Sequence, residues 1–190
     1  MSQTNPNNLV LVSMYGHLDS SRESPEIQGK TDQYIPAFVQ YLGSNTQDIK
    51  SVVMCGGLTR SDYPIEESVE ILGYIYETKQ LCDQIKNMEI YAETESVNMV
   101  EQLVFGILKV RVKLKEVTKI IWICDKIRHQ KAQKLIEALL QNTKFEFEVV
   151  SFDRPDINLD ATPDKIFESI PPALENLKLL RTYFDLQINK

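Results

Sequence analysis

The sequence predicts an α/β fold, a doubly wound Rossmann-like domain in which helices cover both faces of a mainly parallel five-stranded sheet. Three observations support this prediction. Five short, largely apolar segments have the length of buried strands. Segments with apolar residues at helical spacing alternate with them, and several strand candidates end abruptly in polar or glycine-containing turns. The strand candidates are residues 9–14, 51–55, 88–91, 120–123 and 145–152.

The helix candidates alternate with these strands along one domain, residues 1–190. Apolar spacing predicts helices at about 31–42, 64–76, 98–108, 126–139 and 171–186. The last of them belongs to a helical extension at about 163–187, beyond the fifth strand. Because that fifth strand alternates before becoming fully apolar, it is expected at an edge of the sheet.

Two helix starts carry more detailed predictions. The second helix has Pro64 in its first turn, and its expected buried face is Ile65, Val69, Leu72, Ile75 and Tyr76. For the third helix, Asn98 with Glu101 three residues later predicts a capping box, and Ser96 is the alternative N-cap one turn earlier.

The fourth strand candidate, Ile120 to Ile123, leads directly into a turn rich in charge. The charged or ionisable residues of this turn are Asp125, Lys126, Arg128, His129 and Lys131. Cations at a helix N-terminus oppose the macrodipole, which predicts a bound anion beside them and a slight gain in stability if an unpaired Arg128 is removed. The alternative, solvated charges on an exposed first turn, fits this pattern equally well.

Other loops are expected at the same carboxyl edge of the sheet. Paired glycines, Gly56 and Gly57, follow the second strand and allow the backbone to approach a ligand closely. Glu66 and Glu67 near the next helix start are either both capping residues, or one of them, with Glu67 preferred, is a ligand group. The polar connection 15–30, which begins with Tyr15, Gly16 and His17, is either a ligand-binding loop or an ordinary insertion.

Composition narrows the functional classes. A net charge of -6 argues against general binding to nucleic acid or to a membrane surface. Three cysteines without CxxC spacing argue against a disulfide framework and a zinc site, and the N-terminus lacks a signal-peptide pattern, so the protein is expected to be cytoplasmic. The fingerprints GxGxxG, P-loop, GxSxG and HExxH are absent from the sequence.

The three strand-end motifs resemble those of the YdcF/SanA/ElyC-like family, bacterial α/β domains of poorly defined function, over about residues 9–152. That family shows a Ser-Gly-Gly turn with a Ser-Glu-Ala helix start, then Glu-x-x-Ser-x-x-Thr-x-Glu-Asn, then Thr-Ser-x-x-His-x-x-Arg-Ala. The corresponding residues here are Cys55-Gly56-Gly57 with Glu66-Glu67-Ser68, then Glu93, Ser96, Met99, Glu101 and Gln102, then Cys124-Asp125, Arg128, Lys131 and Ala132.

The sequence differs from the family at positions whose side chains could take part in a reaction. Arg128 stands at the family's His position and Met99 at its Thr position, so proton transfer at residue 128 is lost. What remains is a cleft with acidic and basic groups that suits a nucleotide-like or anionic small molecule, S-adenosylmethionine included. The predicted ligand-binding residues are Gly56, Gly57, Arg60, Glu67, Glu93, Ser96, Asp125, Arg128 and Lys131.

Three functional classes are compatible with these residues, and the sequence assigns neither catalytic residues nor an oligomeric state. The first is an enzyme or cofactor-dependent protein that acts on a nucleotide-like or phosphorylated molecule. The second is a divergent member that has lost its chemistry and acts as a ligand sensor or protein-interaction module. A metal-dependent hydrolase is a weaker third class, because no close carboxylate pair with an adjacent His is evident.

Overall fold

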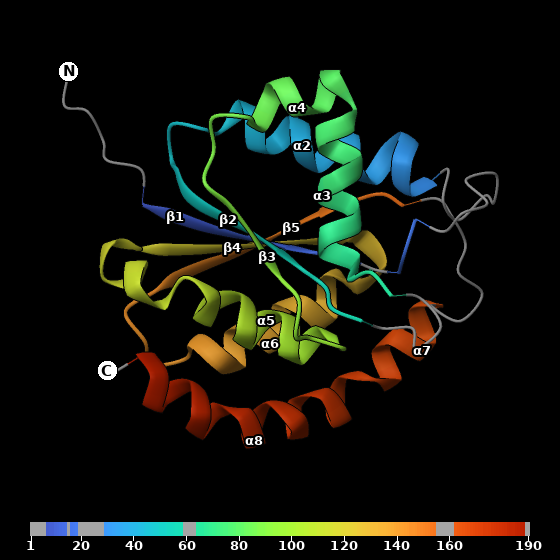
Figure 1. Cartoon of the computed structure of the whole chain (residues 1–190). Helices are drawn as coiled ribbons and strands as arrows, with labels where there is room; N and C mark the ends of the chain where they lie inside the picture. The colour runs from blue at the N-terminus through green and yellow to red at the C-terminus, as the bar shows by residue number, and fades with distance from the viewer. Residues whose placement is uncertain (1–6, 15, 19–28, 59–63, 155–161, 189–190) are drawn as a thin grey trace.

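Five parallel strands form one sheet in the computed structural model (Figure 1), which describes residues 7–14, 16–18, 29–58, 64–154 and 162–188. The strands are β1 (Asn8–Ser13), β2 (Ile49–Cys55), β3 (Ile90–Glu93), β4 (Lys119–Asp125) and β5 (Glu146–Phe152), in the spatial order β3-β2-β1-β4-β5. Every neighbouring pair is parallel. This confirms the predicted fold class and the edge position of the fifth strand.

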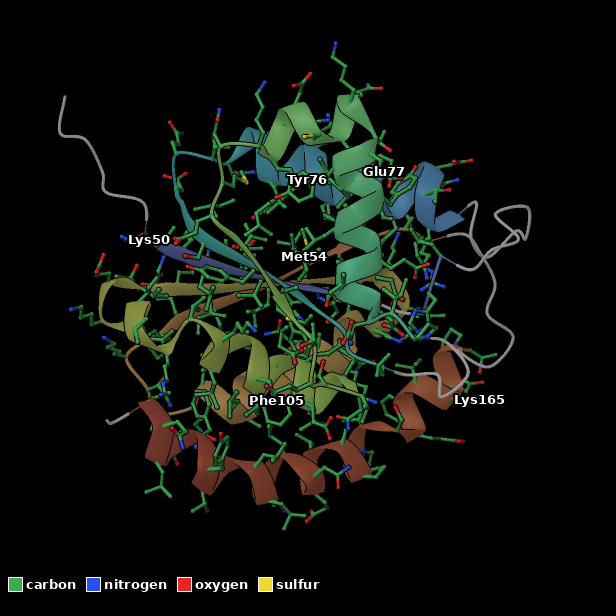
Figure 2. All side chains as sticks on the ribbon, viewed as in Figure 1. Lys50, Met54, Tyr76, Glu77, Phe105 and Lys165 are labelled. Carbon is green, nitrogen blue, oxygen red and sulfur yellow. The ribbon has the colours of Figure 1, made fainter. Side chains whose placement is uncertain are left out.

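One face of the sheet is covered by α2 (Ile35–Ser44), α3 (Glu67–Glu77) and α4 (Lys79–Ile85), with a short π-helix (Lys30–Tyr34) leading into α2. Alternate residues of the central strands point toward these helices and form one half of the core with them. Met54 of β2, labelled in Figure 2, is fully buried in this half.

The opposite face is covered by α5 (Met99–Lys109) and α6 (His129–Leu140). A further helix, α8 (Ile170–Ile188), lies outside α5 and α6 as an additional layer, and α7 (Pro163–Glu168) precedes it (Figure 1). The helix α8 buries Ala173, Leu177 and Phe184 against the core of that face. The C-terminal extension is thus a pair of helices that packs on the domain.

The helices that follow β1 and β2 lie on one face, whereas those that precede and follow β4 lie on the other. Between β1 and β4 the direction of winding therefore reverses. Ligands of doubly wound sheets bind outside the carboxyl ends of the strands at such a reversal. In a fold of this kind, a ligand site is therefore expected at the loops after β1 and β4.

The predicted buried face of the second helix was wrong for three of its five residues. Ile65, Val69 and Tyr76 are 41%, 42% and 50% exposed, whereas Ile71 and Ile75 are fully buried. The reason is that the start of α3 turns Glu67 and Ser68 toward the sheet, which rotates the apolar stripe partly into solvent.

The predicted N-cap of the third helix is confirmed at Asn98. Its side-chain oxygen accepts hydrogen bonds from the amides of Val100 (3.0 Å) and Glu101 (3.1 Å). Glu101 in turn accepts from the amide of Val97 at 2.8 Å, one residue before the cap.

Across the described segments, no helix has both the length and the apolar composition needed to cross a membrane.

Candidate functional site

The three predicted motifs all lie at the carboxyl edge of the sheet. Gly56 and Gly57 follow the end of β2, Glu93 is the last residue of β3, and Asp125 is the last residue of β4. Because the strands are parallel, these ends meet at one edge. Arg60, the remaining predicted ligand group near the glycines, lies outside the described residues.

The glycine turn packs directly against the loop between β3 and α5. The amide of Gly56 donates to the carbonyl of Glu93 at 3.1 Å, and the amide of Gly57 donates to the carbonyl of Ser96 at 2.8 Å. A Cβ atom on Gly57 would lie only 2.5 Å from the carbonyl oxygen of Thr94 and 2.6 Å from that of Ser96. The close approach that these glycines allow is therefore made to the protein's own backbone.

Glu93 and Ser96 hold that loop together. The buried carboxylate of Glu93 accepts hydrogen bonds from the amides of Glu95 (2.6 Å) and Ser96 (2.9 Å) and from the hydroxyl of Ser96 (2.5 Å). These charge-assisted bonds compensate the cost of burying the charge. Burial, together with the nearby Glu93 carboxylate, also raises the pKa of the Cys55 thiol.

The start of α3 is fixed on the same turn. The amide of Glu67 donates to the carbonyl of Gly57 at 3.3 Å, and the amide of Ser68 donates to that of Gly56 at 2.9 Å. The Ser68 hydroxyl donates to the carbonyl of Glu93 at 2.9 Å. The Glu67 carboxylate is buried beside Gly56, where a Cβ atom would lie 3.1 Å from Oε2. Glu67 thus belongs to the same polar cluster as Glu93.

The cations after β4 have partners within the protein. Arg128 forms an ion pair with Asp125, which also accepts a hydrogen bond from the Arg128 amide at 3.1 Å. Lys126 pairs with Asp153 at 3.2 Å, and Lys131 donates to the hydroxyl of Ser169 at 2.9 Å. Burial, and to a lesser extent the charge of Arg128, lowers the pKa of Lys131.

The expectation that Arg128 is unpaired in the free protein is therefore wrong. The anion expected beside it is Asp125, a buried residue of the same turn. Removing the guanidinium would leave this carboxylate without its ion-pair partner, so Arg128→Ala is expected to destabilise the protein rather than to stabilise it.

The structure adds residues of the first strand-to-helix loop that the list of predicted ligand groups lacks. Lys30 is buried and donates to the carbonyls of Gly16 (2.5 Å) and His17 (3.2 Å). The imidazole Nδ1 of His17 lies 3.3 Å from Glu70 Oε2, which also accepts from the amide of Leu18 at 2.8 Å. His17 lies at the start of the possible ligand-binding loop after the first strand but is not among the predicted ligand groups, whereas no local pattern marks Lys30 or Glu70.

Gln102 connects α5 with the end of β1. Its side-chain amide donates to the carbonyl of Met14 at 3.1 Å, and the residue is only 3% exposed. Its other polar atom, Oε1, is buried without a hydrogen-bond partner among the described residues. This buried acceptor near the reversal of the sheet therefore has hydrogen-bonding capacity that no described residue uses.

In chemical terms, the edge combines a histidine against a carboxylate, a buried lysine, two buried glutamates and a glutamine acceptor. These groups can orient a small polar molecule by hydrogen bonds and opposite charges. Among the residues that the structure describes, no three His, Cys, Asp or Glu side chains come together in a group that could hold a metal ion.

A comparison with protein-family models found no match for this sequence, and searches among curated proteins and solved structures found no similar chain. The resemblance to the YdcF/SanA/ElyC-like family therefore stays a prediction that rests on the three strand-end motifs.

Proposed function

We propose that this protein binds a small nucleotide-like or anionic ligand at the carboxyl edge of the sheet, near the ends of β1 and β4. The observation that carries the proposal is where buried polar residues lie. Within the described segments, all of the buried polar and charged side chains except Ser51 lie at or next to this edge. Since burying polar groups costs free energy, their concentration at the usual ligand-binding edge favours a preformed polar site.

Gln102 indicates the kind of group that the ligand presents. Its buried Oε1 accepts no hydrogen bond from a described residue and lies in the side chain that also bonds Met14 at the end of β1. An amino or hydroxyl group of the ligand would complete this acceptor. Nucleotides and S-adenosylmethionine carry such donors together with anionic groups, and the resemblance to the YdcF/SanA/ElyC-like family supports the same class.

The alternative is a divergent, non-catalytic member that acts as a ligand sensor or protein-interaction module. It is favoured by the internal bonding of Glu93 and Asp125, whose carboxylates hold their own loops. The exposed apolar residues Ile65, Val69 and Tyr76 on or beside α3 also fit a surface for a partner.

A thermal-shift screen over nucleotides, S-adenosylmethionine and sugar phosphates tests the proposal. Ligand binding to the folded state alone adds about 2.7 kcal/mol at a hundredfold excess over Kd. For a protein of this size, that corresponds to a rise in melting temperature of roughly 5–11 °C. At least one class in the panel is expected to give such a rise.

A matched pair of variants then tests whether the ligand binds next to Gln102. Gln102→Leu removes the buried acceptor, and calorimetric titration of the folded variant is expected to show about a tenfold loss of affinity. Gln133→Leu is the control, because the side chain of Gln133 bonds, among the described residues, to Glu137 alone on the exposed side of α6. If no compound in the panel stabilises the protein, the interaction module becomes the better description. Wild-type affinity in Gln102→Leu would exclude a site over the end of β1.

A further inference from the structure

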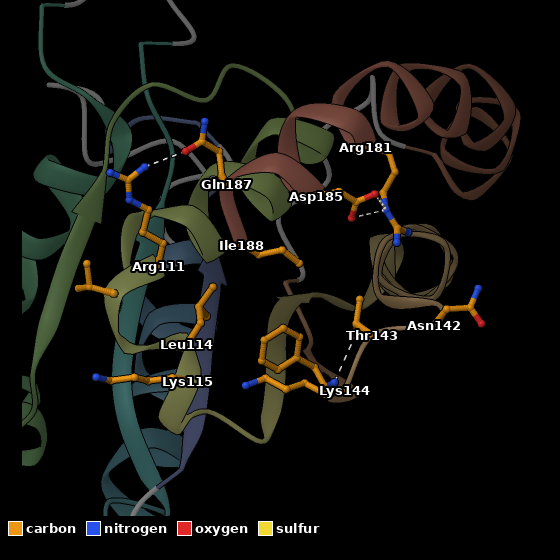
Figure 3. A pocket seen from close by; sticks show the side chains of 12 residues that line it. Arg111, Leu114, Lys115, Asn142, Thr143, Lys144, Arg181, Asp185, Gln187 and Ile188 are labelled. Carbon is orange, nitrogen blue, oxygen red and sulfur yellow. Dashed lines mark hydrogen bonds and ion pairs between the residues drawn. The ribbon is translucent and has the colours of Figure 1, made fainter. Parts of the chain in front are cut away.

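A polar cavity lies at the amino edge of the sheet, opposite the candidate site (Figure 3). It has a volume of about 970 Å³ and is formed by the 3-10 helix Arg111–Glu116, the turn between α6 and β5, and the end of α8. The strands separate this edge from the loops after β1 and β4, whereas Arg111 and Gln187 also line a smaller hollow that reaches Glu93, Thr94 and Glu95. The size falls within the range of small-molecule sites.

The walls of this cavity carry four cations, Arg111, Lys115, Lys144 and Arg181, and a single acidic residue, Asp185. Arg181 pairs with Asp185 at 2.8 Å and donates to the carbonyls of Ala138 (3.2 Å) and Leu139 (2.7 Å) near the end of α6. That pair therefore has a structural role, and its charges cancel. The other three cations remain to give the cavity its charge.

Arg111, Lys115 and Lys144 form no ion pair with any described residue, although the protein as a whole carries a net charge of -6. Their neighbours on the same 3-10 helix do pair. Lys113 pairs with Glu89, and Glu116 pairs with Lys50 at 2.5 Å. Both of these acidic groups are thus engaged by other lysines, which leaves an electropositive cavity on an acidic protein.

Two of the three cations have further contacts beside an apolar floor. The guanidinium of Arg111 donates to Gln187 Oε1 at 2.8 Å, and the ammonium of Lys144 lies 5.3 Å from the centre of the Phe145 ring. The side chains of Leu114 and Phe145 are buried beneath them. Figure 3 shows Arg111 and Lys115 on one wall and Lys144 on the other.

We infer that this cavity binds a small molecule that carries two or more phosphate groups. Three cations around one cavity match a multivalent anion better than a single carboxylate, and guanidinium and ammonium groups are the usual phosphate ligands in proteins. The apolar floor would receive a ring or chain of the same molecule. This site is independent of the carboxyl edge and goes beyond the function proposed there.

Calorimetric titration with inorganic triphosphate tests the inference, using the full chain. Wild type is expected to bind it saturably and more tightly than orthophosphate. The double variant Lys115→Ala/Lys144→Ala is expected to lose at least about tenfold in affinity, because two charge-assisted contacts disappear. The control Lys79→Ala/Lys134→Ala removes the same charge from exposed lysines on α4 and α6 and is expected to stay within about twofold of wild type.

Three results would overturn the inference. The first is the absence of saturable binding by wild type. The second is an equal loss in both double variants, which would mean that net charge alone attracts the anion. The third is tighter binding of a glutamate-rich peptide than of triphosphate, which would assign the cavity to a protein partner. Gln102→Leu should leave triphosphate binding unchanged, so failure of this site and failure of the carboxyl-edge site are distinguishable.

Discussion

Replacing Gly57 by alanine tests how the carboxyl-edge loops are held together. The added Cβ would lie 2.5 Å from the carbonyl oxygen of Thr94 and 2.6 Å from that of Ser96, both of them backbone atoms that cannot rotate away. Overpacking of this kind costs about 1–3 kcal/mol. Alanine also lowers the conformational entropy of the unfolded chain, which offsets about 0.4–1 kcal/mol of this cost. The free energy of unfolding should therefore decrease by roughly 1–2 kcal/mol. The melting temperature should then fall by about 2–8 °C.

Gly73→Ala is the matched control, because it makes the same chemical change at a site with room for it. Gly73 is an exposed residue inside α3, and a Cβ there would meet nothing within 4 Å. Since alanine is the better helix former, this variant should gain about 0.5–1 kcal/mol and melt about 1–4 °C higher. Urea unfolding of both variants measures the difference. If Gly57→Ala were as stable as Gly73→Ala, the packing of the glycine turn against the β3–α5 loop would be refuted.

Other predictions concern the helix cap and the cysteines. Asn98→Ala should lower the free energy of unfolding by about 1 kcal/mol, since two amides at the start of α5 lose their acceptor. A decrease below about 0.3 kcal/mol in urea unfolding would contradict the role of Asn98 as N-cap. Burial raises the pKa of the thiols of Cys55 and Cys124, so a thiol reagent at pH 8 should modify both far more slowly than the partly exposed Cys82, and fast reaction at either would contradict the strand assignments. These raised pKa values also mean that the folded chain keeps protons that the unfolded chain loses above about pH 8.5, so the free energy of unfolding should decrease as the pH rises from 8 to 10. Replacing both cysteines by alanine should make this decrease smaller, and an unchanged pH profile would exclude the thiols as its cause.

The fold was predictable because local signals agree with it. Residues Ile120 to Ile123 are an apolar run too short for a helix, and all four are buried in β4. Alternation of such runs with helices leaves few arrangements besides a parallel sheet covered on both faces. Parallel strands then place all strand-end loops at one edge, which is why three motifs distant in sequence could be assigned to the same place.

Helical spacing was less informative about which face of a helix is buried. In and just before α3 the apolar residues repeat at the expected interval, but Ile65, Val69 and Tyr76 are exposed. The rotation of the helix is set by hydrogen bonds from Glu67 and Ser68 to the glycine turn. Such bonds join residues about ten positions apart and leave no periodic trace in the sequence.

The candidate site shows the same limit. Glu93 and Arg128 could be singled out from position, but their partners decide what they do, and those partners are visible only in three dimensions. Lys30 and Gln102 are buried at the end of β1 by contacts that span 14 and 88 residues. Sequence patterns therefore located the edge, and the geometry was needed to show which of its polar groups hold the loops together.

The most direct test of binding at the carboxyl edge is a two-dimensional ¹⁵N–¹H NMR titration of the labelled protein with the stabilising compound from the panel. Glycine amides report on both edges and on the helices. Gly16, Gly56 and Gly57 lie at the ends of β1 and β2, whereas Gly43 lies near the end of α2 and Gly73 lies within α3. Saturable shifts at the first three glycines, with Gly43 and Gly73 unchanged, are the predicted result. Shifts confined to Gly43 and Gly73, or none at any of the five with every compound of the panel, would contradict a ligand site at this edge.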